Sequence, residues 1–178
     1  SEGQWGTLAS IDGIMLFKRD YSGAPLIFLP YEATYNYEQL IVEYGGIIDD
    51  PASSTGKVLH RTGIEKPDTT FWYGPYETIP PGKYAARFRL KVNSTSVGYI
   101  LTIDMSYNIS KNIVSSVKMY GSNFTVANTW QTFELKFYIN KPVAVEFRGI
   151  NATNGVEIYL DTIRITQIAP LMKSTDSP

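Results

Sequence analysis

Apolar and polar residues alternate along much of the second half of the chain, which is the pattern of a β-strand with one buried face. In 84–92, the even positions from Ala86 to Val92 are apolar and the odd positions from Arg87 to Lys91 are basic. The alternation recurs in 132–139 and 143–148, and less regularly in 97–103, 113–120 and 156–165. Strands at this spacing, without helical segments between them, predict an all-β fold, an antiparallel β-sandwich of the jelly-roll type.

The last of these runs changes phase once. Its apolar residues stand at even positions in Val156–Leu160, whereas Ile163 and Ile165 stand at odd positions. One extra residue moves all later side chains to the opposite face of a strand. A β-bulge near 161–162 therefore accounts for the change.

The first fifty residues have a different pattern. Leu8–Phe17 fits a β-hairpin with Asp12-Gly13 as its two-residue turn, and 26–29 is a further short apolar strand. The segment 36–46 fits either a short helix with Asn36 as its N-cap or another strand.

A polar, turn-rich stretch at 49–56 is the candidate boundary between this region and the sandwich. The sequence accordingly predicts an N-terminal hairpin or extended segment at 1–50, possible as an element shared between subunits. It predicts the jelly-roll sandwich at 51–168 and a C-terminal tail at 169–178.

Charge and hydropathy exclude two classes of partner. The formal net charge is −1, which excludes the strongly basic surface that dominates nucleic-acid binding. The longest apolar runs, such as 13–17 and 24–29, are far shorter than the ~20 residues that span a bilayer, so no membrane span is expected. Aromatic residues make up 13% of the chain and suit the half-buried surfaces of strands.

Candidate catalytic groups are few. The chain has one histidine, His60, and no cysteine, which excludes a histidine-rich metal site and a cysteine nucleophile. No Gly-x-Ser-x-Gly motif surrounds a serine, and the sequence singles out no pair of acids for glycosidase chemistry. We therefore expect a protein that is not an enzyme.

Four Asn-x-Ser/Thr sequons are candidate glycosylation sites. They begin at Asn93, Asn108, Asn123 and Asn151, and each lies in a segment that strand periodicity assigns to a connection. Because glycans need exposed loops, this placement is typical of a secreted glycoprotein. The alternative is that asparagine and serine are simply common in turns.

The aromatic cluster Phe71-Trp72-Tyr73-Gly74-Pro75-Tyr76 is a second signal. Exposed aromatic rings stack on sugars and also form protein interfaces. Trp72, Tyr73 and Tyr76 are therefore candidate ligand-binding residues. In a strand Phe71 and Tyr73 face one side and Trp72 the other, so at least one ring belongs to the core. Core and corner packing of the cluster is the alternative.

Asp161 stands among apolar residues of the last predicted strand, where an unpaired carboxylate is costly. It is a candidate Ca²⁺ ligand, together with carbonyl oxygens and acids such as Glu32, Asp49 or Asp50. The alternatives are that it accepts hydrogen bonds from loop amides or faces solvent at the bulge. The sequence suggests no other cofactor.

Three segments carry a family resemblance: Thr70–Tyr76, the turn Pro80–Tyr84 leading into Arg87–Val92, and the closing Tyr159–Ile163. Over roughly residues 52–168 they resemble the jelly-roll carbohydrate-binding modules and their galactose-binding-like relatives. The segment 12–25 is similar to segments near the C-termini of large archaeal membrane proteins, in which such a sandwich follows outside the cell. The resemblance implies an extracellular, cell-surface setting in an archaeon.

Two functions fit these observations. The leading hypothesis is an N-glycosylated structural subunit that assembles with copies of itself into a cell-surface filament, tubule or layer. Its N-terminal strands would complete a neighbour's sheet by strand addition. The residues expected to take part are Leu8, Ile11, Ile14, Leu16, Leu26 and Phe28. The alternative is a carbohydrate-binding module that holds a polysaccharide on the aromatic cluster.

Overall fold

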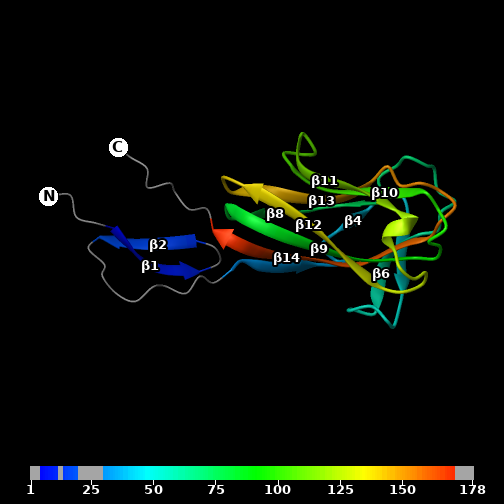
Figure 1. Cartoon of the computed structure of the whole chain (residues 1–178), viewed down its shortest axis with the longest axis horizontal. Coiled ribbons are helices and arrows are strands. Elements are labelled where there is room, and N and C mark those ends of the chain that lie inside the picture. Colours follow the sequence, from blue (N-terminus) through cyan, green and yellow to red (C-terminus); the bar gives the residue numbers. More distant parts are fainter. Residues whose placement is uncertain (1–4, 12–13, 20–29, 171–178) are drawn as a thin grey trace.

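The computed structural model describes residues 5–11, 14–19 and 30–170, and these ranges consist mainly of β-strands. Two six-stranded antiparallel sheets form a sandwich, and a two-stranded sheet precedes them (Figure 1). The predicted all-β jelly-roll class is thus confirmed. Within these ranges, no helix has the length and apolar character needed to cross a membrane.

The front sheet has the strand order β11-β10-β13-β7-β4, and β8 pairs with β13 outside this path. Its strands are β4 (Ile41–Val42), β7 (Trp72–Tyr73), β8 (Pro75–Ile79), β10 (Tyr99–Tyr107), β11 (Asn112–Tyr120) and β13 (Val143–Ile150). One turn of 3-10 helix, η1 (Gly121–Asn123), follows β11.

The back sheet has the order β12-β9-β14-β6-β5, and β3 pairs with β14 outside this path. Its strands are β3 (Glu32–Tyr35), β5 (Gly46–Asp49), β6 (Lys57–Arg61), β9 (Gly82–Val92), β12 (Gln131–Ile139) and β14 (Ile158–Pro170). The longest ladder joins β9 to β14, the two longest strands of this sheet.

The sandwich begins earlier than the sequence predicted. β3, β4 and β5 lie before residue 50, yet they pair with β14, β7 and β6. The polar stretch 49–56 connects β5 to β6 within a hairpin, because turn residues serve hairpins as well as linkers. The predicted boundary at residue 50 therefore falls inside the sandwich.

The segment 36–46 forms a turn and two short strands, so the strand alternative holds. The carbonyl oxygen of Asn36 accepts hydrogen bonds from Gln39 N and Leu40 N at 3.2 and 3.1 Å. This single turn does not continue, because β-branched residues and then Gly45-Gly46 follow, and both disfavour a helix.

The core lies between the sheets and follows the predicted alternation. On β9, the apolar residues Ala86, Phe88, Leu90 and Val92 are fully buried. The inward-facing residues of the neighbouring long strands complete the core: Leu135, Phe137, Ile139, Val143, Val145, Phe147, Ile158 and Leu160. Period-two patterning thus determines which face of each strand is buried.

The predicted bulge is present in β14. Between Leu160 and Thr162 the register with β9 advances by one residue on β9 and by two on β14, so Asp161 is the extra residue. The shift returns Ile163 and Ile165 to the core, where both are fully buried.

Trp72 of β7 is fully buried and lies against the backbone of Gly149 in β13. A Cβ atom on Gly149 would lie 2.2 Å from the nearest ring carbon of Trp72. The ring also packs edge-on against Phe71, with centroids 5.1 Å apart. Glycine at position 149 is therefore what lets the largest core side chain fit.

The N-terminal hairpin that the sequence predicted is formed by β1 (Trp5–Ile11) and β2 (Ile14–Arg19). Their register pairs Ile11 with Ile14. Among the described strands, β1 and β2 pair with each other and with neither large sheet. The predicted turn at 12–13 lies outside the described residues, as do Leu26 and Phe28.

Gly149→Ala tests the fit between β13 and Trp72. We expect the free energy of unfolding to fall by about 1–3 kcal/mol, because an added methyl group overpacks a filled core. Urea denaturation followed by tryptophan fluorescence measures the change. Gly98→Ala is the control, since no atom lies within 4 Å of its added Cβ. Equal losses in the two variants would show that the Trp72 contact is not the cause.

Candidate functional site

The outer face of the front sheet carries polar side chains that are buried although they point away from the core. Asp104 and Ser106 of β10 are fully buried, and Glu146 and Arg148 of β13 are nearly so. Antiparallel pairing places Asp104 opposite Arg148 and Ser106 opposite Glu146. The sequence pattern had placed Glu146 and Arg148 on an outer face, and the pairing of β10 with β13 supplies their partners.

Asp104 and Arg148 form a bidentate ion pair. Arg148 donates from Nε and Nη2 to the two carboxylate oxygens of Asp104, at 2.8 and 2.6 Å. Burial raises the pKa of Asp104, and the hydrogen bonds to Asp104 raise the pKa of Arg148. Because the fork geometry fixes both planes, the pair is a rigid part of this face.

Glu146 fixes the neighbouring part of the face. Its Oε2 accepts hydrogen bonds from Ser110 N and Oγ, both at 2.9 Å, and its Oε1 accepts one from the Tyr76 hydroxyl at 2.8 Å. Burial and this hydrogen bond raise the pKa of Tyr76 to about 12. One buried carboxylate thus holds both the Tyr76 ring and the turn between β10 and β11.

Next to Glu146 lies a surface hollow of about 300 Å³, called hollow 2 here. Tyr73 and Tyr76 of the predicted aromatic cluster line it, with ring centroids 6.2 Å apart. Trp72 does not, because its ring fills the space between the sheets. The expectation that Trp72 contacts a ligand is therefore corrected: it is a core residue.

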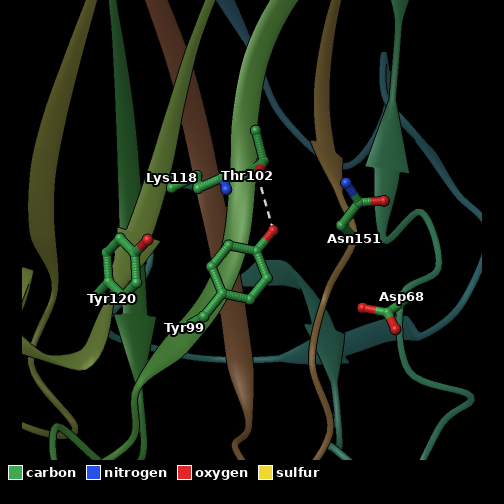
Figure 2. A pocket seen from close by; sticks show the side chains of 6 residues that line it. All are labelled: Asp68, Tyr99, Thr102, Lys118, Tyr120 and Asn151. Carbon is green, nitrogen blue, oxygen red and sulfur yellow. Dashed lines mark hydrogen bonds between the residues drawn. The ribbon is translucent and has the colours of Figure 1, made fainter.

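A larger hollow of about 480 Å³, called hollow 1, opens on the same sheet (Figure 2). The residues that line it are Asp68, Tyr99, Thr102, Lys118, Tyr120 and Asn151. Cross-strand pairing of β10 with β11 sets Tyr99 opposite Tyr120 and Thr102 opposite Lys118. Two strands therefore supply four of the lining residues.

A register irregularity between Tyr99 and Leu101 brings the Tyr99 ring to the outer face. In a regular strand Tyr99 would share the core side with Leu101, but both Ile100 and Leu101 are buried and Tyr99 is not. Its hydroxyl lies 2.8 Å from Thr102 Oγ1. Its ring meets that of Tyr120 edge-on, with centroids 5.8 Å apart.

Two loops form the other side of hollow 1. Asp68 N donates to Ala152 O at 2.9 Å, and Ala152 N donates to Thr69 O at 3.0 Å. These bonds tie the loop before β7 to the loop before β14. Figure 2 shows the result: Asp68 and Asn151 lie together, on the side of the hollow opposite Tyr120.

Hollow 1 combines aromatic rings with hydrogen-bonding groups of several kinds. The Asp68 carboxylate accepts hydrogen bonds, the Lys118 ammonium group donates them, and the Asn151 amide does both. Burial raises the pKa of Tyr99, so its hydroxyl stays neutral at physiological pH. Such groups can hold a hydroxyl-rich ligand without covalent chemistry.

His60 lies on β6 of the back sheet and lines neither hollow. Its Nε2 is 3.1 Å from Glu157 Oε2, and its ring stacks on Tyr159 with centroids 4.4 Å apart. The imidazole is thus part of a surface cluster on the opposite sheet.

The acids predicted as Ca²⁺ ligands have separate partners. Asp161 is fully buried and accepts hydrogen bonds from Ser54 N, Ser54 Oγ and Arg89, so the loop-amide alternative describes its contacts. The other three pairs are Asp49–Lys57, Asp50–Lys91 and Glu32–Arg164. In the part of the chain that the structure describes, no three acidic, histidine or cysteine side chains are grouped to hold a metal.

The four sequon asparagines are all exposed. Asn93 directly follows β9, Asn108 lies in the turn between β10 and β11, Asn123 lies in η1, and Asn151 directly follows β13. Asn151 lines hollow 1, and the turn that contains Asn108 borders hollow 2. Two of the sequons therefore lie at the hollows.

Sequence reasoning missed most of hollow 1. No local motif marks Tyr99, Tyr120, Lys118 or Asp68, because the hollow is created by pairing between strands and between loops. One signal was present: Tyr99 and Tyr120 stand near the two far ends of consecutive predicted strands, 97–103 and 113–120, which an antiparallel hairpin brings together.

Comparisons with known proteins support the fold. No protein-family model and no curated protein matches the sequence. A family 35 carbohydrate-binding module from Clostridium thermocellum matches with a TM-score of 0.53 at 18% identity, over 75% of this chain and 97% of that chain. The module CBM6cm-2 from Cellvibrio mixtus lichenase 5A, solved in complex with cellotriose, matches with a TM-score of 0.50 at 15% identity, over 76% of this chain and 96% of that chain.

Longer enzymes contain the same fold as one segment. The chain matches an MgGH51 α-L-arabinofuranosidase with a TM-score of 0.50 at 13% identity, and it spans 23% of that chain. It also spans 23% of the Arthrobacter globiformis isomalto-dextranase, with a TM-score of 0.51 at 15% identity. These similarities show the fold of this chain: the jelly roll of carbohydrate-binding modules.

Asp161→Ala tests the bonds that fix the bulge of β14. We expect the free energy of unfolding to fall by about 3 kcal/mol, because the change leaves Arg89 without its buried partner. Urea denaturation measures the loss. Asp49→Ala is the control, since its ion pair with Lys57 is exposed to solvent and is expected to contribute nothing measurable.

Calcium titration tests the metal prediction on the same proteins. We expect the unfolding midpoint of the unsubstituted chain to stay unchanged on addition of Ca²⁺, because Ser54 and Arg89 already occupy the Asp161 oxygens. A rise that disappears in Asp161→Ala would show instead that this carboxylate binds the ion.

Proposed function

We propose that this chain is a non-catalytic carbohydrate-binding domain, whose ligand lies on the outer face of the front sheet with hollow 1 as its main contact. The observation that carries the proposal is the pair of tyrosine rings, Tyr99 and Tyr120, set edge to face in a hollow that also holds a carboxylate, an ammonium group and an amide.

Sugars need both kinds of contact. The C–H face of a pyranose ring packs on an aromatic face, while its hydroxyls exchange hydrogen bonds with polar side chains. Tyr120 has 41% of its surface exposed and can offer a ring face to a ligand. Asp68, Lys118 and Asn151 lie within the same hollow to bind hydroxyls.

The charges favour a neutral glycan. Hollow 1 holds one anionic residue, Asp68, and one cationic residue, Lys118, so it has no net attraction for acidic sugars. Binding should therefore depend little on ionic strength, since screening weakens interactions between charges.

Two further observations support a binding role rather than hydrolysis. Asp68 is the single carboxylate among the residues lining hollow 1, whereas glycosidases use a pair of acids on either side of the scissile bond. The similar Cellvibrio mixtus module was solved with cellotriose bound. We extend the proposal to location and modification: an extracellular or cell-surface domain, glycosylated at exposed sequons.

A second candidate function is self-assembly through the N-terminal hairpin. The observation that favours it is that β1 and β2 pair with neither large sheet among the described strands, which leaves hairpin backbone groups available for a neighbouring copy. Leu8, Ile11, Ile14 and Leu16 lie in this hairpin.

Tyr120→Ala tests the carbohydrate proposal. With the unmodified full chain from a bacterial host, screened on a glycan array and measured by calorimetry, we expect affinity to fall about 5- to 30-fold, the effect of losing about 1–2 kcal/mol of aromatic contact. Binding of the unsubstituted chain should be nearly the same at low and high salt.

Tyr138→Ala is the matched control. Tyr138 has 47% of its surface exposed, similar to Tyr120, but it lies on β12 of the back sheet. The control should bind like the unsubstituted chain. Equal loss in both variants, or no glycan bound by the unsubstituted chain, would contradict the proposed function.

Leu16→Asp tests self-assembly. Light scattering after size-exclusion chromatography should show assemblies of the full chain and a shift towards monomers in the variant, because a charge at this apolar position opposes burial in a neighbour. Lys18→Glu, on the same strand, should leave assembly unchanged. A full chain that is monomeric at high concentration would rule out this function.

A further inference from the structure

Asn151 has two properties that no other residue of the described face combines. It begins the sequon Asn151-Ala152-Thr153, and its side chain lines hollow 1. It is exposed, and its backbone has a positive φ of 51°. In Figure 2 its amide group lies at the edge of the hollow, with the nitrogen on the side of Thr102 and Tyr99.

The backbone around Asn151 is fixed, so the direction of a group attached to it is restricted. Ala152 is fully buried and exchanges backbone hydrogen bonds with Asp68 and Thr69. Thr153 N donates to Ile100 O at 2.8 Å. An oligosaccharide attached to the Asn151 amide would therefore start at the hollow rather than extend from a mobile loop.

We propose that Asn151 is an N-glycosylation site whose oligosaccharide occupies hollow 1, so that modification at this residue closes the site to free polysaccharide. The inference rests on the proposed function for its consequence, and on the position of Asn151 for the placement of the glycan. The domain would thus exist in an open, unmodified form and a closed, glycosylated form.

Tethering explains why an attached sugar outcompetes a free one. A ligand joined to its site by a short link has an effective concentration on the order of millimolar, whatever the concentration of protein. The first sugar also takes the space above the Tyr99 and Tyr120 rings that a free ligand needs. Both effects weaken binding of free polysaccharide.

The other sequons provide a contrast. Asn93 and Asn123 line neither hollow, and their side-chain oxygens accept hydrogen bonds from the backbone of Glu157 and Tyr120. A glycan at Asn93 leaves hollow 1 open. The sequon that begins at Asn93 is therefore a control for glycosylation as such.

The test compares three forms of the full chain from one glycosylating host: the unsubstituted chain, Thr153→Val and Thr95→Val. Thr153→Val removes the sequon at Asn151 but keeps the asparagine, and Thr95→Val does the same at Asn93. Mass spectrometry of peptides gives the occupancy of each site. Binding to the polysaccharide selected with the unmodified chain gives the affinity.

We expect Asn151 to be occupied in the unsubstituted chain and in Thr95→Val, and both to bind free polysaccharide about tenfold or more weakly than Thr153→Val does. An unmodified Asn151 in this host would overturn the proposal. Equal affinities of the unsubstituted chain and Thr153→Val, with Asn151 occupied, would also overturn it.

A second readout does not depend on polysaccharide binding. Nitration of exposed tyrosines, mapped by mass spectrometry, should be several-fold slower at Tyr120 in the unsubstituted chain than in Thr153→Val, and equal at Tyr138 in both. Protection of Tyr120 in a protein that binds no glycan would support the placement while rejecting the proposed function. Equal nitration of Tyr120 would reject the placement itself.

Discussion

The ion pair between Asp104 and Arg148 is the constraint on which the outer face of the front sheet depends. Both side chains are buried, and they meet because β10 and β13 pair in one register. A slip by one residue would turn these charges towards the core without partners, at a cost of several kcal/mol. The same register sets Ser106 opposite Glu146, so one pairing determines the positions of the groups along the whole face.

This rigidity matters for the proposed role. A site that already holds its aromatic rings in place loses little conformational entropy when a ligand binds. Tyr99 is fixed by Thr102 in hollow 1, and Tyr76 is fixed by Glu146 in hollow 2. The chain also places a glycosylation sequon at hollow 1, so ligand binding and modification at Asn151 compete for the same space.

The sequence predicted what depends on local alternation. It identified the long strands, the buried face of β9 and the bulge at Asp161, because each leaves a periodic signature within one strand. It missed what depends on distant pairing. The irregularity that turns Tyr99 outward has no local signature, Trp72 is buried because Gly149 makes room for it, and 49–56 looked like a linker because hairpin turns and linkers share a composition.

Tyrosine-ring NMR of the unmodified full chain, titrated with soluble neutral oligosaccharides, tests the central claim most directly. The account predicts that the ring signals of Tyr99 and Tyr120 shift along a saturable curve while those of Tyr138 and Tyr159 stay in place. Shifts confined to the back-sheet tyrosines, or none with any oligosaccharide, would contradict it.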